Sequence, residues 1–137
     1  MESDIEGIFI THNSRIVDIQ AEFTARYPFL KIDFFKPGKN IKGLKSIKIE
    51  SGTSLDKLAG TGTSWRIDIN CSRTISEISQ DFLNTLGVIV QVSRKSGNVW
   101  NVISVTEGWT LKSQNTAGEF ISSLMKLNPS SGKFHTI

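Results

Sequence analysis

Histidine and cysteine are among the side chains that most often act as a base or a nucleophile, and the chain holds only two histidines and one cysteine. His12 precedes one expected helix, and Cys71 precedes another, where a helix N-terminus can activate a thiol. A hydrolytic triad needs a nucleophile, a base and an orienting acid brought together. No second histidine lies near Cys71 in the sequence. We therefore expect no catalysis, and keep an enzyme as an alternative that a deep cleft gathering His12, Cys71 and a carboxylate would support.

Metal and phosphate sites also lack a clear signal. Glu77 and Asp81 are the nearest pair of metal-ligating residues, one turn apart on an expected helix, and we interpret them as a solvated helix face. The glycine-rich residues 60–63 lead into an expected strand, whereas a phosphate-binding loop of this kind leads into a helix. We expect neither a metal nor a cofactor.

Basic and aromatic side chains are the best candidates for contact with a partner. Trp100 lies in an expected hairpin strand beside the basic pair Arg94 and Lys95, and Trp109 follows it. Because tryptophan contributes a large contact area at little entropic cost, we predict a protein-binding surface of Arg94, Lys95, Trp100 and Trp109 that extends to Asn115. Burial in the core is the competing expectation for both indoles and the one that we favour, most of all for Trp109.

A second basic series has a lysine at every third position: Lys36, Lys39, Lys42, Lys45 and Lys48. A step of three fits no single strand face, and lysines on exposed strands discourage edge-to-edge aggregation, which is our interpretation of the series. The alternative is a nucleic-acid site, for which both basic hairpins must lie on the same side of the molecule. The residues of that site would be Lys36, Lys39, Lys42, Arg94 and Lys95.

The composition is that of a soluble globular domain. The chain has 137 residues, of which 38% are hydrophobic and 21% charged, and its apolar runs are too short to cross a bilayer. The net charge of +3 permits an acidic partner but lacks the clustered excess of a dedicated nucleic-acid binder. The acidic first residues do not resemble a secretory signal. We expect one cytoplasmic domain over 1–137, without membrane contact.

The elements that position these residues occur twice. Apolar stripes with identical spacing predict one helix from Ile16 to Tyr27 and a second from Ile75 to Leu86. A short strand precedes each helix, and each helix is followed by an alternating strand, a glycine-bearing turn and another strand. We place these turns at 36–40 and 94–98.

We predict an α+β fold of two related strand-helix-strand-strand units, 7–58 and 65–115, packed as one domain with a C-terminal helix over 116–127. Each unit alone would hold only a marginal core, so their sheets are expected to join or pack together. Thr116 and Glu119 form the expected capping box of the last helix. Its expected buried stripe is Phe120, Ile121, Leu124 and Leu127.

The segments "VQVSRKSGNVW" and "GWTLKSQN" of the second unit resemble a family of conserved, functionally unassigned bacterial proteins with an RKSGN-W hairpin and a WTLxxQN segment. The resemblance covers about residues 75–115. The first unit departs from it, because Lys42 stands where Trp100 would fall. The resemblance implies a bacterial source and no particular reaction.

These patterns predict a small non-catalytic binding or adaptor domain whose partner is a protein. Nucleic-acid binding through the basic hairpins is the first alternative, and an enzyme is the second. Self-association through an uncovered hairpin strand is also open.

Overall fold

The computed structural model describes residues 7–40, 43–54 and 64–127, and the predicted α+β class is confirmed. Its elements are β1 (Gly7–Thr11), α1 (Ile16–Arg26), β2 (Leu30–Asn40), β3 (Gly43–Lys48), β4 (Ser64–Asp68), α2 (Ile75–Leu86), β5 (Ile89–Ser96), β6 (Val99–Val102) and α3 (Leu111–Leu127). The order strand-helix-strand-strand thus occurs twice and is followed by a helix. Lys42 and the side chain of Lys39 lie outside the described part of the chain.

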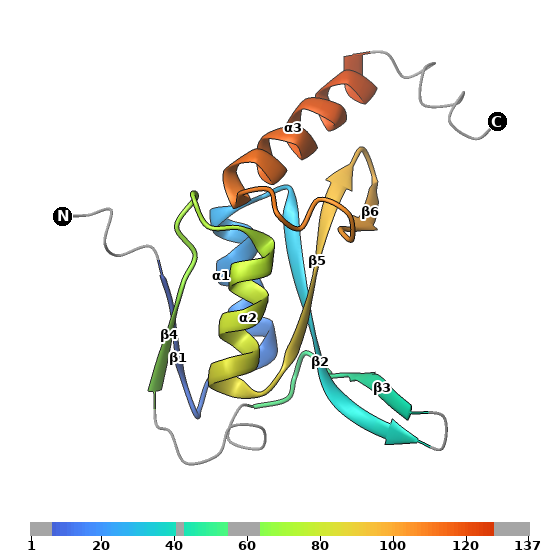
Figure 1. Cartoon of the computed structure of the whole chain (residues 1–137). Helices are drawn as coiled ribbons and strands as arrows, with labels where there is room; N and C mark the ends of the chain where they lie inside the picture. Colours follow the sequence, from blue (N-terminus) through green and yellow to red (C-terminus); the bar gives the residue numbers. More distant parts are fainter. Residues whose placement is uncertain (1–6, 41–42, 55–63, 128–137) are drawn as a thin grey trace.

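The two units share both sheets. β1 pairs with β4 in a two-stranded antiparallel sheet, and the four-stranded sheet has the order β3-β2-β5-β6, with β2 antiparallel to β5. Equivalent strands therefore pair with each other, as across a two-fold axis. α1 contacts β1 and β2, and α2 contacts β4 and β5, so the helices form a layer between the sheets (Figure 1).

The same local link recurs in both units. Arg15 forms an isolated antiparallel bridge with Ser54, and Thr74 forms the equivalent bridge with Thr110. Each bridge joins the start of a helix to the loop after the last strand of its unit. This shared detail supports the interpretation of the chain as two related units.

One apolar core contains the helix stripes of both units. The first stripe contributes Ile16, Ile19, Phe23 and Tyr27, and the second contributes Ile75, Ile78, Phe82 and Leu86. The capping box of α2 forms as predicted: Glu77 N–H donates to Thr74 Oγ1 at 3.1 Å, and Thr74 N–H donates to the Glu77 carboxylate at 2.9 Å. Since both stripes enter the same core, each unit supplies part of the apolar core on which the other packs.

The predicted first turn at 36–40 is wrong. These residues belong to β2 and pair with β3, from Phe35 opposite Lys48 to Asn40 opposite Gly43. Pro37 is tolerated there because β5 pairs with β2 only as far as Phe35, which leaves the end of β2 with a single neighbouring strand.

The second turn is shorter than predicted. Its centre is Gly97 and Asn98, and Gly97 has a φ of 68°, the left-handed conformation that a tight hairpin turn needs. Arg94 and Lys95 lie in β5 and pair with Asn101 and Trp100. The basic pair is therefore part of the strand and not the tip of the hairpin.

The last helix begins earlier than predicted and buries a different face. Thr110, and not Thr116, caps it: Ser113 N–H donates to Thr110 Oγ1 at 3.1 Å. Its buried residues are Leu111, Gln114 and Gly118, of which only Leu111 has an apolar side chain, so hydrophobic spacing pointed to the wrong side. Of the predicted stripe, Ile121 is half-buried, and the exposed members are Phe120, Leu124 and Leu127.

Candidate binding surface

Trp100 brings two lysines together on the outer face of the four-stranded sheet. In the β5–β6 register Trp100 lies opposite Lys95, and in the β2–β5 register Lys31 lies opposite Ser93, two residues before Lys95. Alternate residues of a strand share a face, so Lys31, Lys95 and Trp100 meet. The ammonium groups of Lys31 and Lys95 lie 5.2 and 5.8 Å from the centroid of the indole ring. We call these three residues the lysine-indole cluster.

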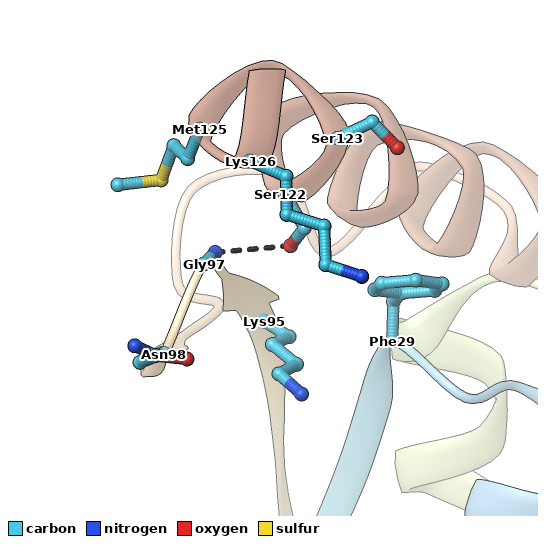
Figure 2. Close-up of a pocket in the computed structure, with 8 residues that line it drawn as sticks. All are labelled: Phe29, Lys95, Gly97, Asn98, Ser122, Ser123, Met125 and Lys126. Atoms are coloured by element: carbon cyan, nitrogen blue, oxygen red, sulfur yellow. Dashed lines mark hydrogen bonds between the residues drawn. The ribbon is translucent and has the colours of Figure 1, made fainter. Parts of the chain in front are cut away.

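A groove adjoins this cluster where α3 crosses the end of the β5–β6 hairpin (Figure 2). The groove, called the α3 groove below, has a volume of about 460 Å³. Gly97 N–H donates to Ser122 Oγ at 2.9 Å and ties the hairpin turn to the helix. The lining residues are Phe29, Lys95, Gly97, Asn98, Ser122, Ser123, Met125 and Lys126.

The charge of this surface is positive and uncompensated. Lys95 and Lys126 are the charged residues in the groove lining, and neither they nor Lys31 forms an ion pair with any residue of the described segments. Asp33, on the same strand as Lys31, is already engaged: its Oδ1 lies 3.9 Å from Lys48 Nζ and accepts a hydrogen bond from the Gln20 amide at 3.2 Å. The three lysines can therefore attract an anionic group.

Arg94, predicted to contact the partner, has a structural role on the opposite face. Its Nη1 donates to Gln114 Oε1 at 2.9 Å, while its Nε is buried without a hydrogen-bond partner in the described structure. Gln114 is fully buried, and its amide donates to the carbonyl of Thr106 at 2.7 Å. Arg94 thus joins β5 to α3 and to the loop before it.

Trp109 is 47% exposed, so the expectation that it is buried is wrong. It precedes α3 and donates its backbone N–H to Thr106, and the apolar residue that enters the core from this segment is Leu111. Trp109 is not among the residues that line the α3 groove. Trp100 is half-buried, which is less than the core burial that we favoured.

Within the described residues the predicted nucleic-acid strip is not continuous, because the two hairpins extend from opposite ends of the sheet (Figure 1). β2 and β5 are antiparallel and pair from Leu30 opposite Arg94 to Phe35 opposite Ile89. β2 therefore continues past one end of this ladder with Lys36, and β5 continues past the other end with Lys95. These lysines cannot form one continuous surface with Arg94, whose guanidinium faces α3.

The candidate catalytic residues are also separated. In the β1–β4 register Gly7 lies opposite Asp68 and Thr11 lies opposite Ser64, so His12 follows one end of this sheet and Cys71 follows the other. Among the described residues no three His, Cys, Asp or Glu side chains are grouped closely enough to hold a metal ion. In the same segments, no helix has the length and apolar character needed to span a bilayer.

The carboxylates expected on a solvated helix face take part in an ion-pair cluster. Arg73 donates to Asp81 and to the carbonyl of Asp68, and its Nε lies 3.9 Å from Glu77. The hydrogen bond that Arg73 donates to Asp81 raises the pKa of Arg73, which therefore stays charged. This cluster fixes the start of α2, and its cation is already paired.

Comparisons with family models, with curated proteins and with solved structures found no match. The resemblance to a bacterial family therefore stays a prediction. The structure does connect the two segments that carry it, since Arg94 of the first is hydrogen-bonded to Gln114 of the second. Asn115 accepts a hydrogen bond from the backbone N–H of Phe29 at 2.8 Å. These residues hold α3 in place.

Three residues of this surface were missed by sequence reasoning: Lys31, Lys126 and Phe29. The alternation of β2 places Lys31 on the solvent side, but its proximity to Trp100 depends on the β2–β5 register, which the sequence does not encode locally. Lys126 lies on the predicted helix, but the side that α3 turns to the sheet was predicted wrongly.

Proposed function

We propose that the protein is a small non-catalytic binding domain that recognises a protein partner through the lysine-indole cluster and the adjoining α3 groove. The single observation that carries the proposal is that Lys31 and Lys95 lie against the half-buried ring of Trp100, next to a groove that Lys126 also lines, and that none of these lysines forms an ion pair within the described segments. Cation–π contacts of this kind contribute about 0.5–2 kcal/mol each and hold the amines in place. A cytoplasmic location fits the free thiol of Cys71.

An apolar side chain beside the cluster favours a protein over a nucleic acid. Val102, two residues after Trp100 on β6, shares its face and is exposed. Protein interfaces combine such apolar area with a polar rim, whereas a nucleic-acid site needs an extended basic surface. Because the two hairpins extend in opposite directions, their lysines do not form such an extended basic surface.

A comparison of two charge reversals tests the proposal. Immobilised wild-type protein, the double variant Lys31→Glu/Lys95→Glu and the control Lys36→Glu are incubated with nuclease-treated lysate of the source organism. Lys36 is an exposed lysine at the other end of the sheet, so its reversal changes charge without touching the cluster. Mass spectrometry of the retained proteins should show a partner bound by the wild type and the control and lost by the double variant. Retention of every bound protein by the double variant would remove the proposed surface.

A further inference from the structure

The α3 groove has the chemistry of a carboxylate site. Its charged lining residues are lysines, and the uncharged polar ones, Asn98, Ser122 and Ser123, can all donate hydrogen bonds. Ser122 Oγ already accepts from Gly97 N–H, which leaves the hydroxyl hydrogen to donate to a ligand. Resting on the proposed function, we propose that the groove binds an acidic peptide segment of the partner, with a glutamate or aspartate carboxylate between Lys95 and Lys126.

The cations of the proposed site come from α3 and β5, and an apolar side chain lies beside them. Figure 2 shows the side chain of Lys126 reaching from α3 toward the ring of Phe29, with Lys95 extending from β5 on the other side of the groove. The ring of Phe29, next to the end of the Lys126 side chain, provides apolar area for the methylene groups of an acidic side chain. A volume of about 460 Å³ is in the range of ligand pockets and accommodates a few side chains of a peptide.

Trp100 acts as a positioning residue for this site. Its ring contacts the ammonium groups of Lys31 and Lys95 and holds in place the charge of Lys95, which lines the groove. Because ammonium groups cover the indole, the ring is not presented for stacking with a nucleobase, which is the main contact in single-strand nucleic-acid sites. The arrangement therefore favours an acidic peptide over a nucleic acid.

A titration followed by amide NMR tests the inference. The probe is a capped octapeptide of alternating glutamate and leucine, compared with the same peptide in which glutamine replaces glutamate and with an oligothymidine of equal length. We expect the glutamate peptide to shift the amide signals of Gly97, Asn98 and Ser122. Lys95→Gln and Lys126→Gln should each weaken binding about tenfold, as expected for the loss of a charge-assisted hydrogen bond, and Lys36→Gln should leave it unchanged.

The role of Trp100 is separated from general stability by a conservative variant. Trp100→Phe retains an aromatic face for the lysines and should bind the glutamate peptide nearly as well as the wild type, whereas Trp100→Leu should bind it several-fold more weakly. The dispersion of the amide spectrum shows whether each variant is folded. Equal binding by the two variants would contradict the positioning role.

Three results would overturn the groove assignment: no shifts at Gly97 and Ser122 with the glutamate peptide, equal shifts with the glutamine peptide, or tighter binding of the oligothymidine. The lysate experiment distinguishes these results from a failure of the proposed function. If the lysate partner is still lost on Lys31→Glu/Lys95→Glu, the protein-binding surface stands and only its acidic ligand is wrong. If the partner is retained, the proposed function fails whatever the peptide does.

Discussion

At the scale of single residues, the buried side chain of Gln114 hydrogen-bonds to two other parts of the second unit. Its carboxamide accepts from Arg94 and donates to Thr106, so Gln114→Leu removes the acceptor of a partly buried guanidinium. We expect the free energy of unfolding to fall by about 3 kcal/mol, because breaking a buried charged contact leaves the cation unsatisfied. Urea denaturation measures the change.

Gln91→Leu, at an exposed position of β5, is the control for Gln114→Leu and should change the free energy of unfolding by less than about 0.5 kcal/mol. Equal effects of the two substitutions would refute this role.

Gly118 is the residue that lets α3 approach the sheet. A Cβ at this position would lie 2.8 Å from Phe29 Cβ and 3.1 Å from the carbonyl oxygen of Lys95. Although alanine favours helix by about 1 kcal/mol, Gly118→Ala should destabilise the protein by about 1–3 kcal/mol through this overlap. Thermal unfolding checks the sign. Gly52→Ala, where a Cβ meets no atom within 4 Å, should be close to neutral. A more stable Gly118→Ala variant would show that α3 does not pack this closely.

Little of this residue-scale detail could be predicted from the sequence. The position of Trp100 in a hairpin strand and its basic neighbour Lys95 follow from local patterns, and both take part in the candidate site. The role of Arg94 does not, because an arginine next to a turn looks the same whether its side chain points to water or to a buried glutamine. The partner that decides between these cases, Gln114, is distant in sequence and polar, so hydrophobic spacing gives no sign of it.

At the scale of elements, the faces of α3 can be distinguished by substitution. Phe120 is 62% exposed and Leu111 is fully buried, although sequence spacing placed the first in the core. Phe120→Ser should change the free energy of unfolding by less than about 0.5 kcal/mol, whereas Leu111→Ala should lower it by about 2–5 kcal/mol. Chemical denaturation of both variants decides the point. A large loss in Phe120→Ser would restore the face expected from the sequence.

An element could be predicted correctly where the residues that determine it lie close together in the sequence. α1 and α2 were predicted from apolar stripes that the structure buries, and the capping box of Thr74 and Glu77 fixed the start of α2. The buried face of α3 was predicted wrongly because the helix packs against β5 through Gly118. This residue allows a close approach but has no apolar side chain that a hydrophobic pattern could reveal. The first turn was misplaced because Pro37 and Gly38 favour turns, yet pairing with β3 keeps both extended.

At the scale of the whole molecule, each unit depends on the other for its sheets and its core. β1 pairs with β4 and β2 pairs with β5, so separation of the units breaks both central ladders. We expect fragments 1–60 and 61–137 to be unfolded alone and to regain structure when mixed, and the intact chain to unfold in one transition. Circular dichroism of the fragments, alone and combined, checks this. A fragment that folds by itself would contradict the shared core.

The repeated order of elements could be predicted from the sequence, but the spatial relation between the two units could not. The spacing of stripes and turns repeats along the chain, whereas the antiparallel pairing of β2 with β5 depends on long-range register. That pairing sends the hairpins to opposite ends of the sheet and separates the basic residues into two distinct surfaces. The lysine-indole cluster takes its lysines from β2 and β5, and the adjoining α3 groove adds Lys126 from α3.

The most direct test of the account is the affinity of a purified partner for two single charge reversals, measured by isothermal titration calorimetry. Lys95→Glu lies in both the cluster and the groove, and Lys36→Glu lies at the opposite end of the sheet. The Lys95→Glu variant should bind the partner at least about tenfold more weakly than the wild type, and Lys36→Glu should bind it with unchanged affinity. An unchanged affinity for Lys95→Glu, or an equal loss in both variants, would rule out the proposed surface.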